Sequence, residues 1–84
     1  MMLRPTDYTL AEKNSYGDLT KYRFEAILAM KWPYPSTIDI TYDRAKKEVV
    51  AAVGWGVQLV PIIDIPHPLV DGLVEHYISH RLEN

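Results

Sequence analysis

The sequence contains no cysteine, which excludes disulfide bonds, thiolate metal sites and thiol nucleophiles. It also lacks an apolar run long enough to span a bilayer, because the longest one, residues 49–57, is interrupted by two glycines. The opening residues Met-Met-Leu-Arg-Pro do not form the apolar core of a signal peptide. We therefore expect a cytoplasmic protein that makes no contact with a membrane.

An excess of positive charge is missing as well. Nine Lys and Arg residues stand against eleven Asp and Glu residues, a net charge of −2, whereas dedicated nucleic-acid binders usually present a basic face. With 48% hydrophobic and 24% charged residues, the composition is typical of a globular protein. A chain of 84 residues predicts one small domain, residues 1–84, in which residues 1–5 are a flexible arm.

Alternating side chains predict an antiparallel hairpin over residues 37–43 and 48–60. Ile38, Ile40 and Tyr42 alternate with polar residues, and after the polar connection 44–47 the same period returns. If Asp43 faces Glu48, then Ile40 faces Ala51 and Ile38 faces Val53. This register predicts one inward face, which includes Val49, Ala51, Val53 and Trp55. Gly54-Trp55-Gly56 is the expected position of a bulge or kink.

Residues 19–32 allow two interpretations. As a strand, over about residues 20–32, apolar side chains from Tyr22 to Trp32 alternate with mostly polar ones; as a helix, Arg23 would lie within the apolar stripe. The strand is favoured and the helix stays open. In the strand interpretation Trp32 lies against Ile38 and Met30 against Ile40, so the sheet has three strands.

Helices are predicted at both ends of the sheet. Thr6 resembles an N-cap, and residues 7–14 could form two turns of helix. Near the C-terminus, His67-Pro68 opens an amphipathic helix over about residues 68–82, the natural cover for the inner face of the sheet. The predicted fold class is α+β: a short N-terminal helix, a curved three-stranded antiparallel sheet and a C-terminal helix.

A basic turn is the candidate for nucleic-acid binding. It comprises Arg44, Lys46 and Lys47, and Lys31, Arg23 and the ring of Tyr34 could extend it. The expected order of helix, three strands and helix resembles that of the double-stranded RNA-binding domain. The resemblance is of element order alone, because the last helix here begins His67-Pro68-Leu69-Val70-Asp71 without that family's basic run.

The sequence contains no pattern typical of catalysis or of a cofactor. His76 and His80 lie one helical turn apart, a spacing that lets two imidazoles share a metal ion, but no third ligand has an obligatory place beside them. Asp39, Asp43 and Glu48 cluster near the hairpin end on an outward face without an implied cleft. We expect neither an enzyme nor a cofactor, and no stable metal site.

The surfaces suited to a protein partner are the most informative feature. The predicted outer sheet face is smooth and nearly uncharged, and aromatic side chains of the kind that anchor interfaces are candidate anchors as well. The candidate partner-binding residues are Trp32, Tyr34, Trp55, Ile27, Ala29, Val50 and Ala52. An equal alternative is that the N-terminal segment covers this face through Leu3, Tyr8 and Leu10.

Charge is unevenly distributed along the chain. Residues 21–47 carry a surplus of three positive charges and residues 57–84 an excess of three negative charges. The simpler interpretation is attraction between two parts of one fold, and the alternative is a bipolar docking surface.

These features predict a small non-enzymatic protein–protein interaction module. It could be an inhibitor, or an immunity or anti-defence factor that occludes a partner protein, of the sort that phages and mobile elements encode. The alternative is a self-associating structural subunit, such as a homodimer. A nucleic-acid-binding domain is the less favoured third interpretation.

Overall fold

The fold is an antiparallel sheet with helical segments at both ends. The computed structural model describes residues 4–28, 34–56, 61–62, 65 and 67–79, with the backbone alone for residues 61, 62, 67 and 79. The strands follow one another in the order β1-β2-β3-β4-β5. Their bounds are β1 (Tyr8–Tyr16), β2 (Leu19–Ala26), β3 (Thr37–Asp43), β4 (Glu48–Trp55) and the two-residue β5 (Pro61–Ile62).

A short 3-10 turn, η1 (Pro5–Asp7), precedes the sheet. After it come α1 (His67–Leu73) and a continuation with wider, π-type turns, η2 (Val74–Ser79). The α+β class and the presence of a C-terminal helix are thus as predicted, although residues 80–82 of the expected helix lie outside the described residues. The sheet has four long strands where three were expected. No helix in the described part of the chain is long and apolar enough to cross a membrane.

The predicted N-terminal helix over residues 7–14 is wrong, because this segment is strand β1. β1 pairs with β2 through a two-residue turn in which Gly17 has a φ of 60°, a conformation that glycine adopts without steric cost. A helix of two turns is marginal by itself, whereas the strand buries Tyr8 completely. The resemblance in element order to the double-stranded RNA-binding domain is lost with this helix.

The strand interpretation of residues 19–32 holds for residues 19–26, whereas residues 27–28 form a bend and residues 29–32 lie outside the described part of the chain. The expected register against β3 is wrong. Phe24 lies opposite Ile38 and Tyr22 opposite Ile40, eight residues away from the expected partners Trp32 and Met30. The inward face is nevertheless preserved, because a displacement by an even number of residues keeps each side chain on its side. The N–H of Ala26 donates to the carbonyl of Ser36 at 2.8 Å, which closes the connection after β2.

A bulge in β4 shifts the second half of the predicted hairpin by one residue. Asp43 faces Glu48 and Tyr42 faces Val49 as expected, but Thr41 then faces Ala51, so Val50 is the extra residue. Beyond the bulge Ile40 faces Ala52 and Ile38 faces Gly54. The prediction that Ala51, Val53 and Trp55 point inward, with Ala52 and Gly54 outward, is therefore wrong.

Close packing explains why glycine lies on the inner side at position 54. A Cβ atom there would be 3.1 Å from the Pro35 Cβ and 3.1 Å from the Ile65 Cδ1. The bulge expected at Gly54-Trp55-Gly56 lies at Val50 instead. Gly54 serves to let the segments that contain Pro35 and Ile65 pack closely against β4.

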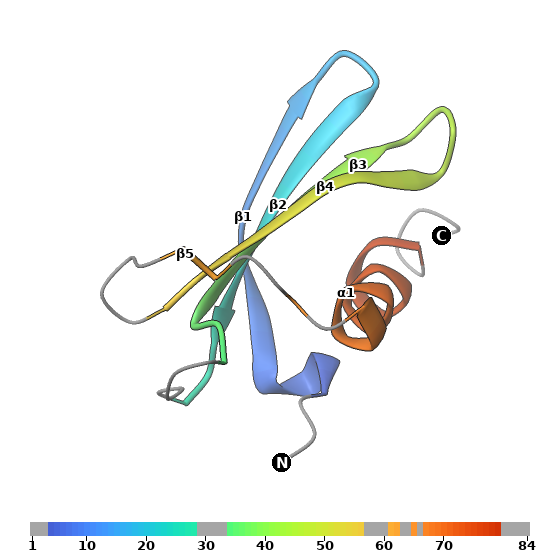
Figure 1. Ribbon diagram of the computed structural model, residues 1–84. Coiled ribbons are helices and arrows are strands. Elements are labelled where there is room, and N and C mark those ends of the chain that lie inside the picture. Colours follow the sequence, from blue (N-terminus) through green and yellow to red (C-terminus); the bar gives the residue numbers. More distant parts are fainter. Residues whose placement is uncertain (1–3, 29–33, 57–60, 63–64, 66, 80–84) are drawn as a thin grey trace.

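The core lies between the sheet and the C-terminal helical segment. Figure 1 shows α1 on one face of the sheet. The buried apolar side chains come from both layers: Tyr8, Tyr22, Phe24, Ile38, Ile40, Tyr42, Leu69, Val70, Leu73 and Ile78. This packing holds the opposite, outer face of the sheet in a defined shape.

Two tyrosine hydroxyls form hydrogen bonds that connect β1 with the segment before β3 and with the C-terminal helical segment. The Tyr8 hydroxyl donates to the carbonyl of Pro35 at 2.5 Å, and the Tyr77 hydroxyl donates to the carbonyl of Tyr8. Burial, with a smaller contribution from Asp7, raises the pKa of Tyr8 to about 12. The neutral phenol is therefore the form that stabilises the fold.

Replacing Tyr8 by Phe should lower the free energy of unfolding by about 1–3 kcal/mol, because the buried carbonyl of Pro35 loses its donor. Urea denaturation at pH 7 measures this loss. Tyr16→Phe is the matched control, since Tyr16 is 66% exposed, and it should be within about 0.5 kcal/mol of the wild type.

The same phenol predicts a loss of stability in alkali. The pKa of Tyr8 rises from 10.0 unfolded to about 12 folded, so its contribution is complete below pH 10 and is lost as the pH rises toward 12. Urea denaturation between pH 9 and 12 should show a smaller decline for Tyr8→Phe than for the wild type. Equal declines in the two proteins would show that Tyr8 does not titrate as described.

Candidate partner-binding surface

A charged pair lies at the centre of the outer face. Arg23 on β2, Asp39 on β3 and Val53 on β4 are successive neighbours across three strands. The Arg23 Nε donates to Asp39 Oδ1 at 2.8 Å and its Nη2 donates to Oδ2 at 3.0 Å. This bidentate geometry fixes the guanidinium plane as well as its position.

Asp39 is 4% exposed although it belongs to the outer face. Besides Arg23, the Lys21 Nζ lies 3.4 Å from Asp39 Oδ2, and Glu12 Oε2 lies 3.9 Å from Arg23 Nη1. The hydrogen bond to Asp39, followed by its charge, raises the pKa of Arg23. Arg23 is therefore held as a cation, and its two hydrogen bonds to Asp39 join β2 and β3.

Arg23 also reaches the aromatic ring of Trp55 at the end of β4. Its guanidinium carbon lies 5.8 Å from the ring centroid, within the range of a cation–π contact. Trp55 is half-buried. The indole is thus positioned by an arginine that is itself held by Asp39.

Apolar side chains surround this pair on the β4 side. We define the outer-face patch as Val50, Ala51, Val53 and Trp55. Val50 is 56% exposed and Val53 is 43% exposed. Exposed apolar groups beside tryptophan and arginine are typical of the centre of protein–protein interfaces.

Comparison of the chain with protein-family models, characterised proteins and solved structures found no match. What the surface can bind therefore follows from its own side chains. The outer-face patch has no charged group of its own, and the neighbouring Arg23 and Asp39 already neutralise each other. Such a surface suits an apolar partner surface with polar groups at its margin.

Of the predicted partner-binding residues that the structure describes, Val50 and Trp55 lie together in the outer-face patch. Ala52 instead packs against the core. Ile27 is 62% exposed, but it lies in the connection after β2, where it lines a pocket of about 210 Å³ with Leu28, Thr6 and Asp7. Tyr34 is half-buried in the same connection. Trp32 and Ala29 lie outside the described residues.

Tyr8 and Leu10, two of the three residues of the N-terminal segment that could have covered the outer face, pack on the opposite side of the sheet. Tyr8 is completely buried in the core, and Leu10 packs against the same cluster. Both belong to β1 and face α1 rather than the outer-face patch. Leu3, the third residue of that prediction, lies outside the described residues.

The basic turn between β3 and β4 has a structural role at its first residue. Arg44 donates from its guanidinium to the carbonyls of Gly17 and Asp18, which joins the tips of the two hairpins. Lys46 and Lys47 are exposed. The carboxylate of Asp43 accepts the N–H groups of Ala45 and Lys46 at 2.9 and 3.0 Å.

The expected acidic cluster is divided. Asp39 pairs with Arg23 within the sheet, whereas Asp43 holds the turn and Glu48 is exposed at the start of β4. His76 is exposed, with its ring 4.7 Å from that of Tyr77, and His80 lies outside the described residues. Within the described residues, no three metal-ligating side chains lie together.

Sequence reasoning did not predict that Arg23, Asp39 and Val53 lie side by side on the outer face. The signal was present in the alternation, which places Arg23 and Asp39 at outward positions of neighbouring strands. It could be used only with the correct register, which opposes these two residues.

Replacing Asp39 by Asn should lower the free energy of unfolding by about 1.5–3 kcal/mol, because one of the two hydrogen bonds from Arg23 loses its acceptor and the carboxylate charge opposite the guanidinium is removed. Glu25→Gln is the control, since Glu25 is exposed on the same face of β2, and it should change stability by less than about 0.5 kcal/mol. Urea denaturation measures both.

A double-mutant cycle tests whether the pair acts as a unit. Arg23→Met combined with Asp39→Asn should cost less than the sum of the two single changes. Additive costs would show that the two side chains stabilise the fold independently.

Proposed function

We propose that this protein is a small non-enzymatic protein-binding module that acts by occluding a partner protein. The observation that carries the proposal is the outer-face patch, in which exposed apolar side chains of β4 adjoin Trp55 and the fixed Arg23–Asp39 pair. An inhibitor or an immunity factor fits this description, because blocking a partner requires a stable complementary surface and no chemistry of its own.

The patch is preorganised, which favours binding. Trp55 and Val53 belong to a sheet whose other face is closed by the core, and Arg23 is held by two hydrogen bonds. Side chains that are ordered before association lose less conformational entropy when a partner arrives. An interface of typical size takes about 800 Å² from each partner, roughly a seventh of the 5811 Å² surface.

Self-association is the second candidate. The outer-face patch is uncharged, so that two copies could approach one another through it without repulsion between like charges. A homodimer formed in this way would occupy the same surface that a foreign partner needs. The two functions therefore predict opposite results in one experiment.

That experiment is affinity capture of the tagged protein from lysate of its native host, with mass spectrometry of the bound proteins and light scattering of the purified chain. The informative variant is Val50→Gln with Val53→Gln, which keeps the side chains neutral but makes them polar. The matched control is Tyr16→Gln with Leu28→Gln, since those residues are 66% and 75% exposed and lie outside the outer-face patch.

Occlusion predicts one stoichiometric foreign protein that the wild type and the control capture, with at least tenfold less captured by the patch variant. Self-association predicts a defined oligomer that the patch variant dissociates. A monomer whose captured proteins are the same for all three forms would contradict both functions.

A further inference from the structure

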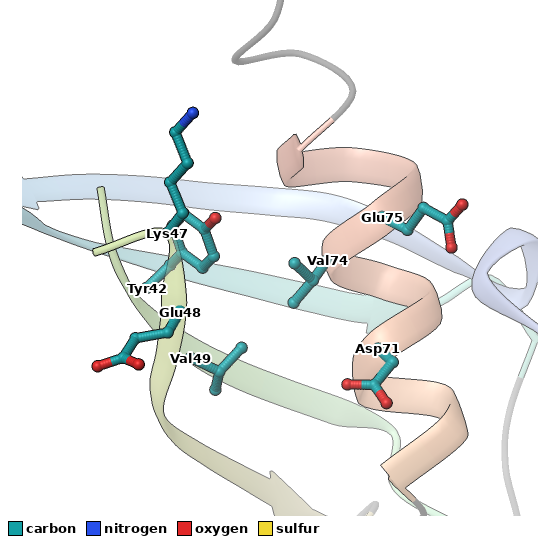
Figure 2. Close-up of a pocket in the computed structure, with 7 residues that line it drawn as sticks. All are labelled: Tyr42, Lys47, Glu48, Val49, Asp71, Val74 and Glu75. Carbon is teal, nitrogen blue, oxygen red and sulfur yellow. The ribbon is translucent and has the colours of Figure 1, made fainter. Parts of the chain in front are cut away.

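A groove opens on the face of the sheet opposite the outer-face patch. It has a volume of about 310 Å³ and lies between the beginning of β4 and the helical segment. Figure 2 shows Val49 from the strand and Val74 from the helix pointing into it from opposite sides. Tyr42 is 3% exposed at its floor, and both valines are half-buried. The groove therefore offers apolar surface at the margin of the core.

The strand that borders the groove has an open edge in the described part of the chain. β4 pairs with β3 along its length, but on its other side β5 pairs only with Gly54 and Trp55. From Glu48 to Val53, alternate backbone N–H and C=O groups thus face away from β3 and have no described strand beside them. An open edge of this kind can accept an extended peptide as an additional strand.

Charge around the groove selects the peptide. Three carboxylates, those of Glu48, Asp71 and Glu75, line the groove against the single ammonium group of Lys47. In Figure 2 the Asp71 carboxylate is directed toward the strand side, and the Lys47 side chain extends away from it. The carboxylates of Glu48 and Glu75 are directed away from the space between the strand and the helix. Among the described residues, none of the three acids forms an ion pair.

We propose that this groove binds an extended basic segment of a partner polypeptide, which adds as a strand to the edge of β4. The aliphatic stem of an arginine or lysine would lie on Val49 and Val74, and its charged head would reach Asp71, with Glu75 adding negative charge on the same helical segment. Long cationic side chains combine an apolar stem with a charged end in this way. The site is separate from the outer-face patch and would bind whether or not that surface occludes a partner.

The test is an NMR titration of the full chain with an acetylated Thr-Arg-Val-Arg-Thr amide. The control probe has Glu in place of Arg. The Arg peptide should shift the amide resonances of Val49 and Val74, and the Glu peptide should not. Raising the salt to 1 M should weaken binding to the wild type at least threefold, because the screening length falls to about 3 Å.

Variants of the protein test whether the carboxylates of Asp71 and Glu75 attract the Arg peptide. Asp71→Asn with Glu75→Gln should weaken the Arg peptide roughly two- to fivefold for each carboxylate removed, the range of exposed ion pairs. Glu75→Gln alone repeats the test at an exposed helix position, should the double variant fold poorly. Glu25→Gln, on the other face of the sheet, should bind as the wild type does.

Three results would overturn the proposal. The first is equal binding of the Arg and Glu peptides, and the second is binding that the acidic variants leave unchanged. The third is a shift of the Val49 and Val74 resonances with protein concentration in the absence of peptide, which would assign the groove to a second copy of the chain.

Discussion

The single extra residue in β4 decides which side chains this protein shows to its surroundings. Before Val50 the strand follows simple alternation from the turn, and after it the phase is reversed. Without the bulge, Val53 would face the core and Gly54 would face outward. The side chains of Pro35 and Ile65, which pack closely against Gly54 on the inner face, would then meet a larger residue. The bulge thus satisfies the inner packing and, by the same step, turns apolar side chains outward.

The outer face carries both a charged pair and an apolar surface, and the two are in contact through Arg23 and Trp55. Arg23 and Asp39 lie at outward positions, yet the cations over Asp39 leave it 4% exposed. Two well-oriented hydrogen bonds compensate the loss of hydration that such coverage imposes. Because Arg23 also lies over Trp55, the position of the largest side chain in the outer-face patch depends on an ion pair between two other strands.

The two faces of the sheet differ in the chemistry they offer. The outer-face patch is apolar and electrically neutral, which suits a complementary protein surface. The groove beside the helical segment combines apolar walls with three carboxylates and a strand edge that no described strand covers from Glu48 to Val53, which would suit the extended cationic segment proposed above. One small sheet can therefore present two surfaces of different chemistry, one on each face.

Much of the architecture was encoded locally. Alternation in residues 37–43 and at the start of β4 determined the hairpin, its turn and the pairs next to the turn. The amphipathic period after His67 determined the helical segment and the face that it buries. These features depend on neighbours in sequence, which is why composition and period were sufficient to predict them.

Tertiary structure alone decided the rest. β1 became a strand because pairing with β2 and burial of Tyr8 outweighed the propensity of a short helix. The register of β2 against β3 and the bulge at Val50 depend on contacts with residues far along the chain, such as Ser36, Pro35 and Ile65. The sequence by itself determined which residues alternate; long-range packing determined where the alternation changes phase, and thereby which side chains face outward.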